Sequence, residues 1–313
     1  MSNTTPSIPS SVERKRFFCF GYGYAANYLG HELQNQEQGW TLGGTVRDDE
    51  RQRALLSRRI RARIFDEGRP IADAQTLFGR FTHLLMSIPP SQNGDMVFDM
   101  HGEDIARLKN IKWLGYLSST SVYGDRDGGA VNEQSEVRPT SARGSKRALA
   151  EQQWMSLYER YGIPVHIFRL SGIYGPGRSA LDSVRAGMSR RINKPGHKFN
   201  RIHVEDIAQV LRQSFENPNP GSIYNLADDS PAPSYDVIEH ACQLLGQPVP
   251  PAIPFEDANL APITMSFYND NKHVLNDKIK SELGVQLKYN NYQKGLEGCL
   301  QAKDHAQDSA QEK

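Results

Sequence analysis

Short apolar runs alternate with amphipathic stretches along the first half of the chain. The apolar runs are Phe17–Phe20, Thr41–Val46, a run ending at Ile64–Phe65, His83–Met86, Trp113–Leu117 and Pro164–Phe168. Helical patterns separate them, first over about Ala25–Leu33 and then over Asp48–Arg58. Strands that are apolar on both faces and alternate with helices are typical of a parallel sheet covered on both sides. The pattern therefore predicts an α/β fold with a doubly wound parallel sheet.

The helix predicted before the sixth strand has an apolar stripe with a 3.6-residue period. Its members are Ala150, Trp154, Leu157, Tyr158 and Tyr161. This stripe can face the core or pair with a second copy of the chain, so a homodimer is one alternative. After Leu170 the alternation loosens, and helices are predicted over Ile207–Phe215, Tyr235–Leu245 and Asn276–Leu283.

Composition excludes several classes of function. The 313-residue chain has a formal net charge of +1, which predicts neither a nucleic-acid partner nor an anionic membrane surface. It contains no apolar run of bilayer-spanning length. Its three cysteines are scattered, as in a protein of the reducing cytoplasm, and they form no metal-binding pair. We expect a cytoplasmic protein with a small-molecule substrate and no metal site.

A glycine turn follows the first strand directly and opens a helix. The segment Gly21-Tyr22-Gly23-Tyr24-Ala25-Ala26 fits the G-x-G-x-x-G/A pattern of dinucleotide-binding folds. In that pattern the first glycine permits a tight turn, the second lets the backbone approach a diphosphate, and the third residue packs the helix on the strand. The helix N-terminus then offers free N–H groups to the phosphates. We expect Gly21, Gly23, Tyr24, Ala25 and Ala26 to bind a dinucleotide.

Residues after the second, third and fourth strands are candidates for further cofactor contacts. Arg47 stands where an NAD-selective site places an acid, and its guanidinium suits a 2′-phosphate, which favours NADP over NAD. The alternative is a solvated arginine next to Asp48. Asp66 is placed to accept from the adenine amine, or is a loop carboxylate. Ser87 lies where the chain should pass the diphosphate and ribose.

Several segments, in order along the chain, resemble the extended short-chain dehydrogenase/reductases, the NAD-dependent epimerase/dehydratase family. They are Leu117–Gly124, Ile173–Arg178, Arg201–Ala208 and Tyr224–Asp228. The resemblance implies a Rossmann domain over 16–170 and a smaller substrate lobe over 171–301, partly interleaved with it. Residues 1–15 and 302–313 are expected to be disordered.

In this family a serine, a tyrosine and a lysine four residues after the tyrosine act together. The resemblance assigns the serine to Ser119 and the lysine to Lys146, which also holds the cofactor ribose. Ala142 stands four residues before Lys146, and the segment Pro139–Glu151 contains no tyrosine. The general acid/base that the family uses is therefore missing, as in an atypical branch of the family. Loss of such a group typically costs about 10²–10⁴-fold in rate.

Two hypotheses remain open for the site. In the first, the chain is an NAD(P)-dependent oxidoreductase or an epimerase/dehydratase-like enzyme for a small polar, sugar-like substrate. Its proton donor would be Tyr123, Tyr174, Lys146 or His203, or its substrate would need little acid assistance in hydride transfer. Thr120, Arg178 and His203 would contact the substrate. In the second, the chain is an NADP(H)-binding sensor or scaffold with little turnover. Each candidate side chain also has a purely structural interpretation, as a strand-end cap, a packing residue or a helix-start residue.

Overall fold

A seven-stranded parallel sheet forms the centre of the molecule. The computed structural model describes residues 15–36 and 39–311, with side chains as far as residue 302. The strand order is β11-β7-β5-β4-β1-β2-β3, and every neighbouring pair is parallel. The strands are β1 (Arg16–Phe20), β2 (Thr41–Val46), β3 (Arg61–Ile64), β4 (His83–Met86), β5 (Trp113–Ser119), β7 (Val165–Leu170) and β11 (Ile223–Leu226). The predicted fold class is confirmed.

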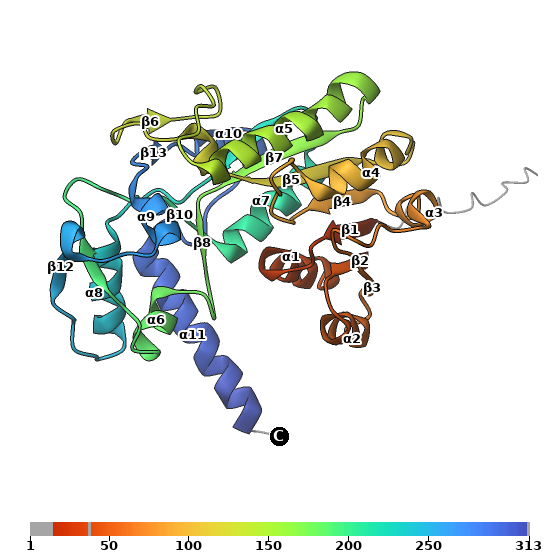
Figure 1. Cartoon of the computed structure of the whole chain (residues 1–313). Helices are drawn as coiled ribbons and strands as arrows, with labels where there is room; N and C mark the ends of the chain where they lie inside the picture. Colours follow the sequence, from red (N-terminus) through yellow and green to blue (C-terminus); the bar gives the residue numbers. More distant parts are fainter. Residues whose placement is uncertain (1–14, 37–38, 312–313) are drawn as a thin grey trace, which may run out of the picture.

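Helices cover both faces of this sheet (Figure 1). One core cluster joins it to α1 (Tyr24–Gln34), α2 (Asp49–Ser57), α7 (Val204–Glu216) and α10 (Asp277–Leu283). The other cluster joins the opposite face to α3 (Ala74–Phe78), α4 (Met96–Ala106) and α5 (Ala142–Tyr161). The chain reverses its winding direction between β1 and β4, and ligands of open α/β sheets bind at such a point, outside the carboxyl ends of the strands.

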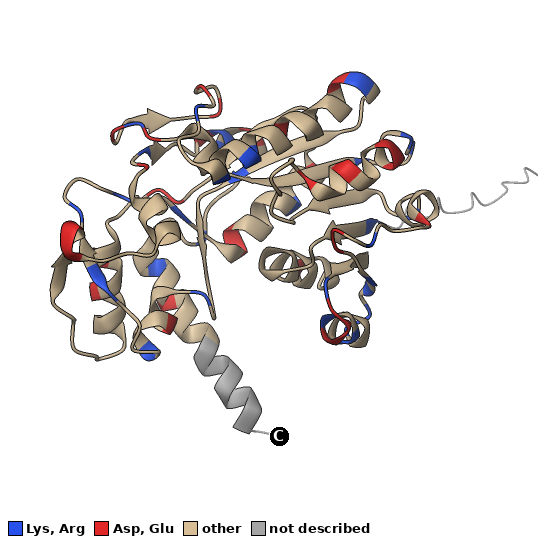
Figure 2. Ribbon diagram, viewed as in Figure 1, with Lys and Arg blue, Asp and Glu red and all other residues tan. Residues whose placement is uncertain are grey.

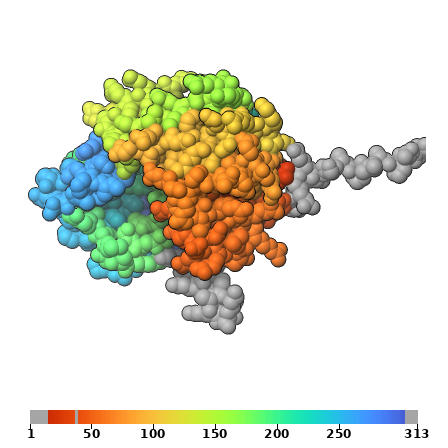
Figure 3. Space-filling model, turned by 45° about the vertical axis from the view of Figure 1, so that its right-hand side comes forward, coloured from red at the N-terminus to blue at the C-terminus, as the bar shows by residue number. Residues whose placement is uncertain are grey.

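A smaller C-terminal lobe lies beside the carboxyl edge of the sheet. Two parallel strand pairs lie within it, β8 (Gly172–Tyr174) with β10 (Arg201–His203) and β9 (Arg191–Asn193) with β12 (Ala252–Pro254). A third pair joins its strand β13 (His273–Val274) to β6 (Ala130–Val131), which lies in the connection between β5 and α5. The helical segments of the lobe are α6 (Ala180–Arg185), α8 (Ser234–Leu244), η2 (Phe255–Asp257), α9 (Pro262–Tyr268) and α11 (Tyr292–Gln311). Figure 3 shows the surface hollowed between the N-terminal residues, in orange, and this lobe, in green to blue.

The structure differs from the sequence prediction in a few elements. Helices α3, α4, α6 and α9 and the short strands of the lobe were not predicted from periodicity, because they are short or carry weak apolar stripes. Helix α11 continues to Gln311, beyond the point where a disordered tail is expected. The other segment expected to be disordered, up to residue 14, lies outside the described residues. Ala150, Trp154 and Leu157 of the predicted stripe are buried in the core, whereas Tyr158 and Tyr161 are exposed.

Charged residues of the two signs are not segregated along the fold. Lysine and arginine are interspersed with aspartate and glutamate over both lobes (Figure 2). In the part of the chain that the structure describes, no helix has the length and apolarity to cross a membrane.

Candidate functional site

The glycine turn is fixed between three neighbouring strands. Gly21 has a φ of +78°, and a Cβ there would lie 2.8 Å from Cγ1 of Ile88, so only glycine fits without a shift. The Gly21 N–H donates to Oγ1 of Thr45 at 2.8 Å, and the Tyr22 N–H donates to the Thr45 carbonyl at 2.8 Å. Thr45 is buried in β2 and was missed by sequence reasoning. In the sequence, the position of this polar residue near the end of an apolar strand is the only feature that indicates a role for Thr45.

Gly23 is a glycine for which the protein alone gives no packing reason. Its φ is −103°, and a Cβ there would meet only the carbonyl oxygen of Gly21, at 3.7 Å. The open space beside it lies at the start of α1, which has no side-chain cap and no acidic residue in its first turn. The N–H groups of such a helix end need an acceptor and favour an anion. The residues therefore fit the diphosphate of a dinucleotide.

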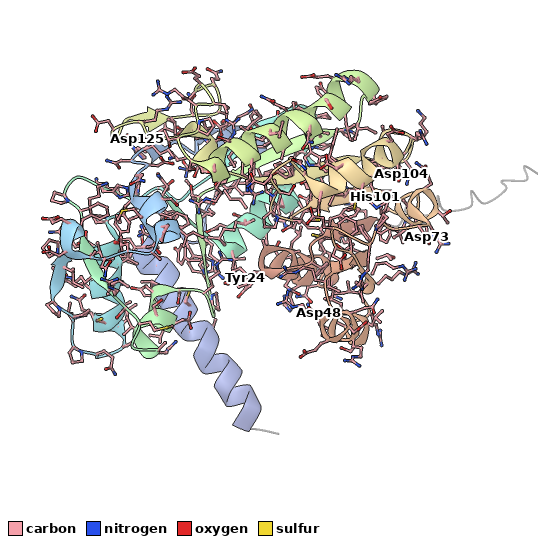
Figure 4. All side chains as sticks on the ribbon, in the orientation of Figure 1. Tyr24, Asp48, Asp73, His101, Asp104 and Asp125 are labelled. Carbon is pink, nitrogen blue, oxygen red and sulfur yellow. The ribbon has the colours of Figure 1, made fainter. Side chains whose placement is uncertain are left out.

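Two acidic residues near this edge are already engaged by their own loops. Asp48 caps α2, where its Oδ1 accepts from the Arg51 N–H at 2.8 Å (Figure 4). Asp66 accepts from the Gly68 N–H at 3.0 Å and pairs with Arg69 at 3.3 Å. Arg47 is exposed, and its side chain has no hydrogen bond or ion pair among the described residues. The acid next to Arg47 is thus a helix cap, and the arginine is available to a ligand.

The chain after β4 passes directly beside the glycine turn, as expected for Ser87. The Ser87 N–H donates to the Phe20 carbonyl at 2.9 Å. The Ser87–Ile88 backbone would lie within 3.4 Å of a Cβ on Gly21. The Ser87 backbone therefore lies next to the glycine turn.

Hydroxyl groups gather at the carboxyl ends of β5 and β7. Ser119 and Leu170 are register partners, and Thr120 donates to the Leu170 carbonyl at 3.4 Å. Ser119 precedes the short helix η1 (Thr120–Tyr123), and its Oγ accepts from the Ser121 N–H at 3.2 Å. Ser171 was not a sequence candidate. Its Oγ is buried with no hydrogen-bond partner in the described part of the chain, directly after β7.

Lys146 and Ala142 lie one turn apart at the start of α5. Ala142 is exposed and Lys146 is half-buried. The Lys146 ammonium forms no hydrogen bond or ion pair with any residue that the structure describes. Next to Ala142, the Arg143 guanidinium stacks 4.0 Å above the ring of Phe267. At the position of the family's tyrosine the chain thus has an exposed alanine, and the ammonium group of Lys146, unpaired among the described residues, belongs to the next helical turn.

Tyr123 does not have the surroundings of a proton donor. Its side chain is fully buried, and its hydroxyl donates to Asn225 Oδ1 at 2.7 Å and accepts from Arg169 at 3.0 Å. Burial raises the pKa of Tyr123. Arg169 in turn forms a buried two-point pair with Glu151, at 3.0 and 2.7 Å. The expectation of catalysis by Tyr123 is not supported, because this hydroxyl belongs to a closed network below the site.

Tyr174 and His203 also lie inside the protein. The Tyr174 hydroxyl is packed against α11 and donates to the Asn291 carbonyl at 3.4 Å, and burial raises its pKa. His203 is fully buried, and its Nδ1 accepts from the Glu205 N–H at 3.2 Å as the cap of α7. Burial lowers the pKa of His203 to about 3, so the ring is neutral at pH 7. Neither geometry supports the expected proton transfer, and among the four candidates Lys146 keeps a free side chain.

Arg178 lies on a tight turn beside the first residue of α1. The Tyr24 hydroxyl donates to the Pro176 carbonyl at 3.0 Å, and the Arg178 guanidinium lies 5.7 Å from the Tyr24 ring centroid. Figure 4 shows Tyr24 at the end of α1 nearest the C-terminal lobe. The turn therefore joins the glycine cradle to that lobe.

The same turn borders a pocket of about 520 Å³ in the C-terminal lobe. Its wall combines three arginines, Arg178, Arg190 and Arg201, with three tyrosines, Tyr174, Tyr268 and Tyr292. Arg201 donates to the carbonyls of Phe199 and Ala232 at 3.0 and 2.9 Å, and Arg190 donates to that of Ala258. The pocket thus presents positively charged and aromatic side chains, together with the carboxylate of Asp182. No group of three potential metal ligands occurs among the residues that the structure describes.

Comparison with known proteins agrees with this architecture. Residues 104–227 match the family described as "NAD dependent epimerase/dehydratase family". A solved structure of a functionally unknown conserved protein from Silicibacter pomeroyi DSS is 45% identical, with a TM-score of 0.85. The likeness covers 92% of this chain and 99% of that one.

Two further similarities are more distant. A trifunctional UDP-glucose 4,6-dehydratase/UDP-4-keto-6-deoxy-D-glucose 3,5-epimerase/UDP-4-keto-L-rhamnose-reductase of Arabidopsis thaliana is 25% identical over 201 residues, which are 61% of this chain. The match spans only 29% of that protein. The dTDP-glucose 4,6-dehydratase of Bacillus anthracis, solved in complex with NAD, is 15% identical with a TM-score of 0.73 over 93% of this chain and 97% of that one, and shows the same fold. Residues 104–227 of this chain are thus similar to the NAD-dependent epimerase/dehydratase family, and the chain shares its fold with a dehydratase solved in complex with NAD.

Proposed function

We propose that the protein is an NAD(P)-dependent oxidoreductase of the epimerase/dehydratase type, acting on a sugar-like anionic substrate. The observation that carries the proposal is the open space at Gly23, at an uncapped helix end with free N–H groups. Related proteins of this fold have been solved with NAD. The exposed Arg47, next to an acid that is occupied as a helix cap, supports a preference for NADP.

The arginine- and tyrosine-lined pocket supports the substrate class. Guanidinium groups bind phosphate or carboxylate, and tyrosine rings provide flat apolar surface. A nucleoside diphosphate joined to a sugar presents both kinds of group. The relatives whose descriptions state a substrate act on sugars carried by UDP, dTDP or ADP, which supports the same assignment.

Within this proposal the chain's own residues orient the reacting oxygen of the substrate. A bound nicotinamide dinucleotide would supply or accept the hydride. The Ser119 Oγ already accepts from a backbone N–H, so its own proton is available to a substrate oxygen. The unpaired Lys146 ammonium would stabilise negative charge on that oxygen and hold the ribose hydroxyls. Lys146 is also the candidate proton donor, since the two tyrosines and His203 are buried.

The experiment is turnover with a panel of sugars linked to UDP, dTDP and ADP, with product detection as well as nucleotide absorbance. We expect conversion of at least one member, and a loss of about 10²–10⁴-fold in kcat for Lys146→Met. Lys109→Met on the exposed surface is the control and should retain full activity. Dinucleotide binding without conversion of any member would overturn the assignment as an enzyme.

A second candidate function is a dinucleotide-binding sensor. It is favoured by one observation, the exposed Ala142 at the position of the family's tyrosine, together with the burial of Tyr123 and Tyr174. A sensor would bind dinucleotide and change its surface without consuming a substrate. The turnover panel separates the two candidates.

A further inference from the structure

The segment Gly175-Pro176-Gly177-Arg178 is a rigid turn. Gly175 and Arg178 exchange two backbone hydrogen bonds, at 3.0 and 3.3 Å. Pro176 and Gly177 occupy the two central positions, and Gly177 has a φ of +76°. Proline followed by a left-handed glycine is the sequence that a type II turn requires. The position of the Arg178 backbone is therefore fixed by local geometry.

This turn is held against the cofactor cradle by one side chain. Tyr24 is the first residue of α1, and its backbone N–H belongs to the uncapped helix end. Its hydroxyl donates to the Pro176 carbonyl at the tip of the turn, at 3.0 Å. A Cβ on Gly175 would lie 2.5 Å from the same hydroxyl, so glycine there permits the close approach. The C-terminal lobe thus contacts the N-terminal one at the diphosphate-binding end of α1.

Arg178 brings an unneutralised charge to this contact. Its guanidinium stacks at 5.7 Å from the Tyr24 ring centroid and makes no hydrogen bond or ion pair among the described residues. The first turn of α1 contains no acidic residue that could neutralise it. A guanidinium beside the ring of the first α1 residue adds to the positive potential that an anion would meet at this helix end.

We infer that Arg178 closes over the diphosphate of the bound dinucleotide, opposite the N–H groups of α1, and so acts as a cofactor residue supplied by the C-terminal lobe. The inference rests on the proposed cofactor site and replaces the expectation that Arg178 binds only substrate. A contact between Arg178 and the diphosphate would also link the two lobes. Because Arg178 also borders the substrate pocket, cofactor binding would hold the pocket wall in place before substrate arrives.

Binding measured by calorimetry, without substrate, tests this inference on the full chain. The probes are NADPH and NADH, ADP-ribose, which keeps the diphosphate, and AMP, which lacks it. Arg178→Met should weaken NADPH, NADH and ADP-ribose by about 10- to 100-fold and leave AMP unchanged, as expected for loss of a charge-assisted contact. Arg178→Lys should recover part of the loss.

Two further variants separate a direct contact from damage to the turn. Tyr24→Phe removes the hydrogen bond to Pro176 but keeps the ring, and should weaken the diphosphate ligands less than Arg178→Met does. Arg185→Met, an exposed arginine of the same lobe that does not line the pocket, should leave the affinities of all four ligands unchanged. Unchanged NADPH and NADH affinity in Arg178→Met, or an equal loss for AMP, overturns the inference while the cofactor site stands. If the wild-type protein binds neither dinucleotide, the proposed function fails as well.

Discussion

At the scale of single residues, the main feature of the candidate site is that Ala142 stands where the family has its catalytic tyrosine. The family's tyrosine would lie one helical turn before Lys146, and the structure places an exposed methyl group there. Ser119 and Lys146 keep the surroundings that their roles need, because neither the Ser119 proton nor the Lys146 ammonium is engaged among the described residues. Under the proposed function, these two side chains would act around one missing hydroxyl.

Restoring that hydroxyl is a direct test of how intact the site is. Ala142→Tyr should raise the rate of carbonyl reduction by about 10²-fold, since a positioned general acid contributes about 10²–10⁴-fold. The measurement is the initial rate of NADPH-dependent reduction across a panel of carbonyl compounds. Ala142→Phe is the matched control, because it adds the ring without the hydroxyl. Equal rates for the Tyr and Phe variants would show that position 142 does not face the reacting carbon.

At the scale of helices and strands, periodicity predicted the sheet well and the site partly. Strands β2 and β4 have the predicted bounds, because a central parallel strand is a continuous apolar run with little alternative. The glycine turn between β1 and α1 could also be predicted, because its geometry depends on residues that are neighbours in the sequence. Thr45 and Ser171 were missed because their roles depend on strands that the chain brings together from far apart. The sequence left Tyr123 open between a proton donor and a packing residue, because its partners Asn225 and Arg169 lie far away along the chain.

The network around Tyr123 ties α5 to β7 and is the clearest case of a long-range polar contact. Glu151 and Arg169 are 7% and 2% exposed and pair at 2.7 Å, and Ser118 donates to the same carboxylate. Breaking such a pair leaves one buried charge without a partner, which typically costs about 3–5 kcal/mol. Helix α5 also carries Lys146, so the network around Tyr123 helps to fix the position of that lysine.

Glu151→Gln should therefore lower the free energy of unfolding by about 3–5 kcal/mol, measured by urea denaturation at pH 7. Glu103→Gln is the control, because its pair with Arg107 is exposed and should contribute little. The double variant Glu151→Leu/Arg169→Met should recover part of the lost stability, since it removes both charges. A loss below about 1 kcal/mol for Glu151→Gln would contradict a structural role for the pair.

At the scale of the whole molecule, the two lobes meet where the chemistry is proposed. The N-terminal sheet supplies the glycine turn, Ser119 and Lys146, and the C-terminal lobe supplies the arginine-lined pocket. The turn at Gly175–Arg178 joins them through Tyr24. Sequence reasoning placed this loop near the cleft by resemblance alone. Its contact with α1 could not be predicted, because it joins residues more than 150 positions apart.

The proposed function requires that the start of α1 binds a diphosphate. The affinity for dinucleotide of a variant at Gly23 tests this requirement most directly. A Cβ at this position meets no side chain, so Gly23→Val should fold with an unchanged melting temperature while its side chain fills the cradle. Titration with NAD, NADH, NADP and NADPH should give saturable binding to the wild-type protein and at least a 100-fold weaker affinity for Gly23→Val, as expected for a blocked contact surface (about 3 kcal/mol). Equal affinities of the two proteins, or no saturable binding of any of the four nucleotides to the wild type, would contradict it.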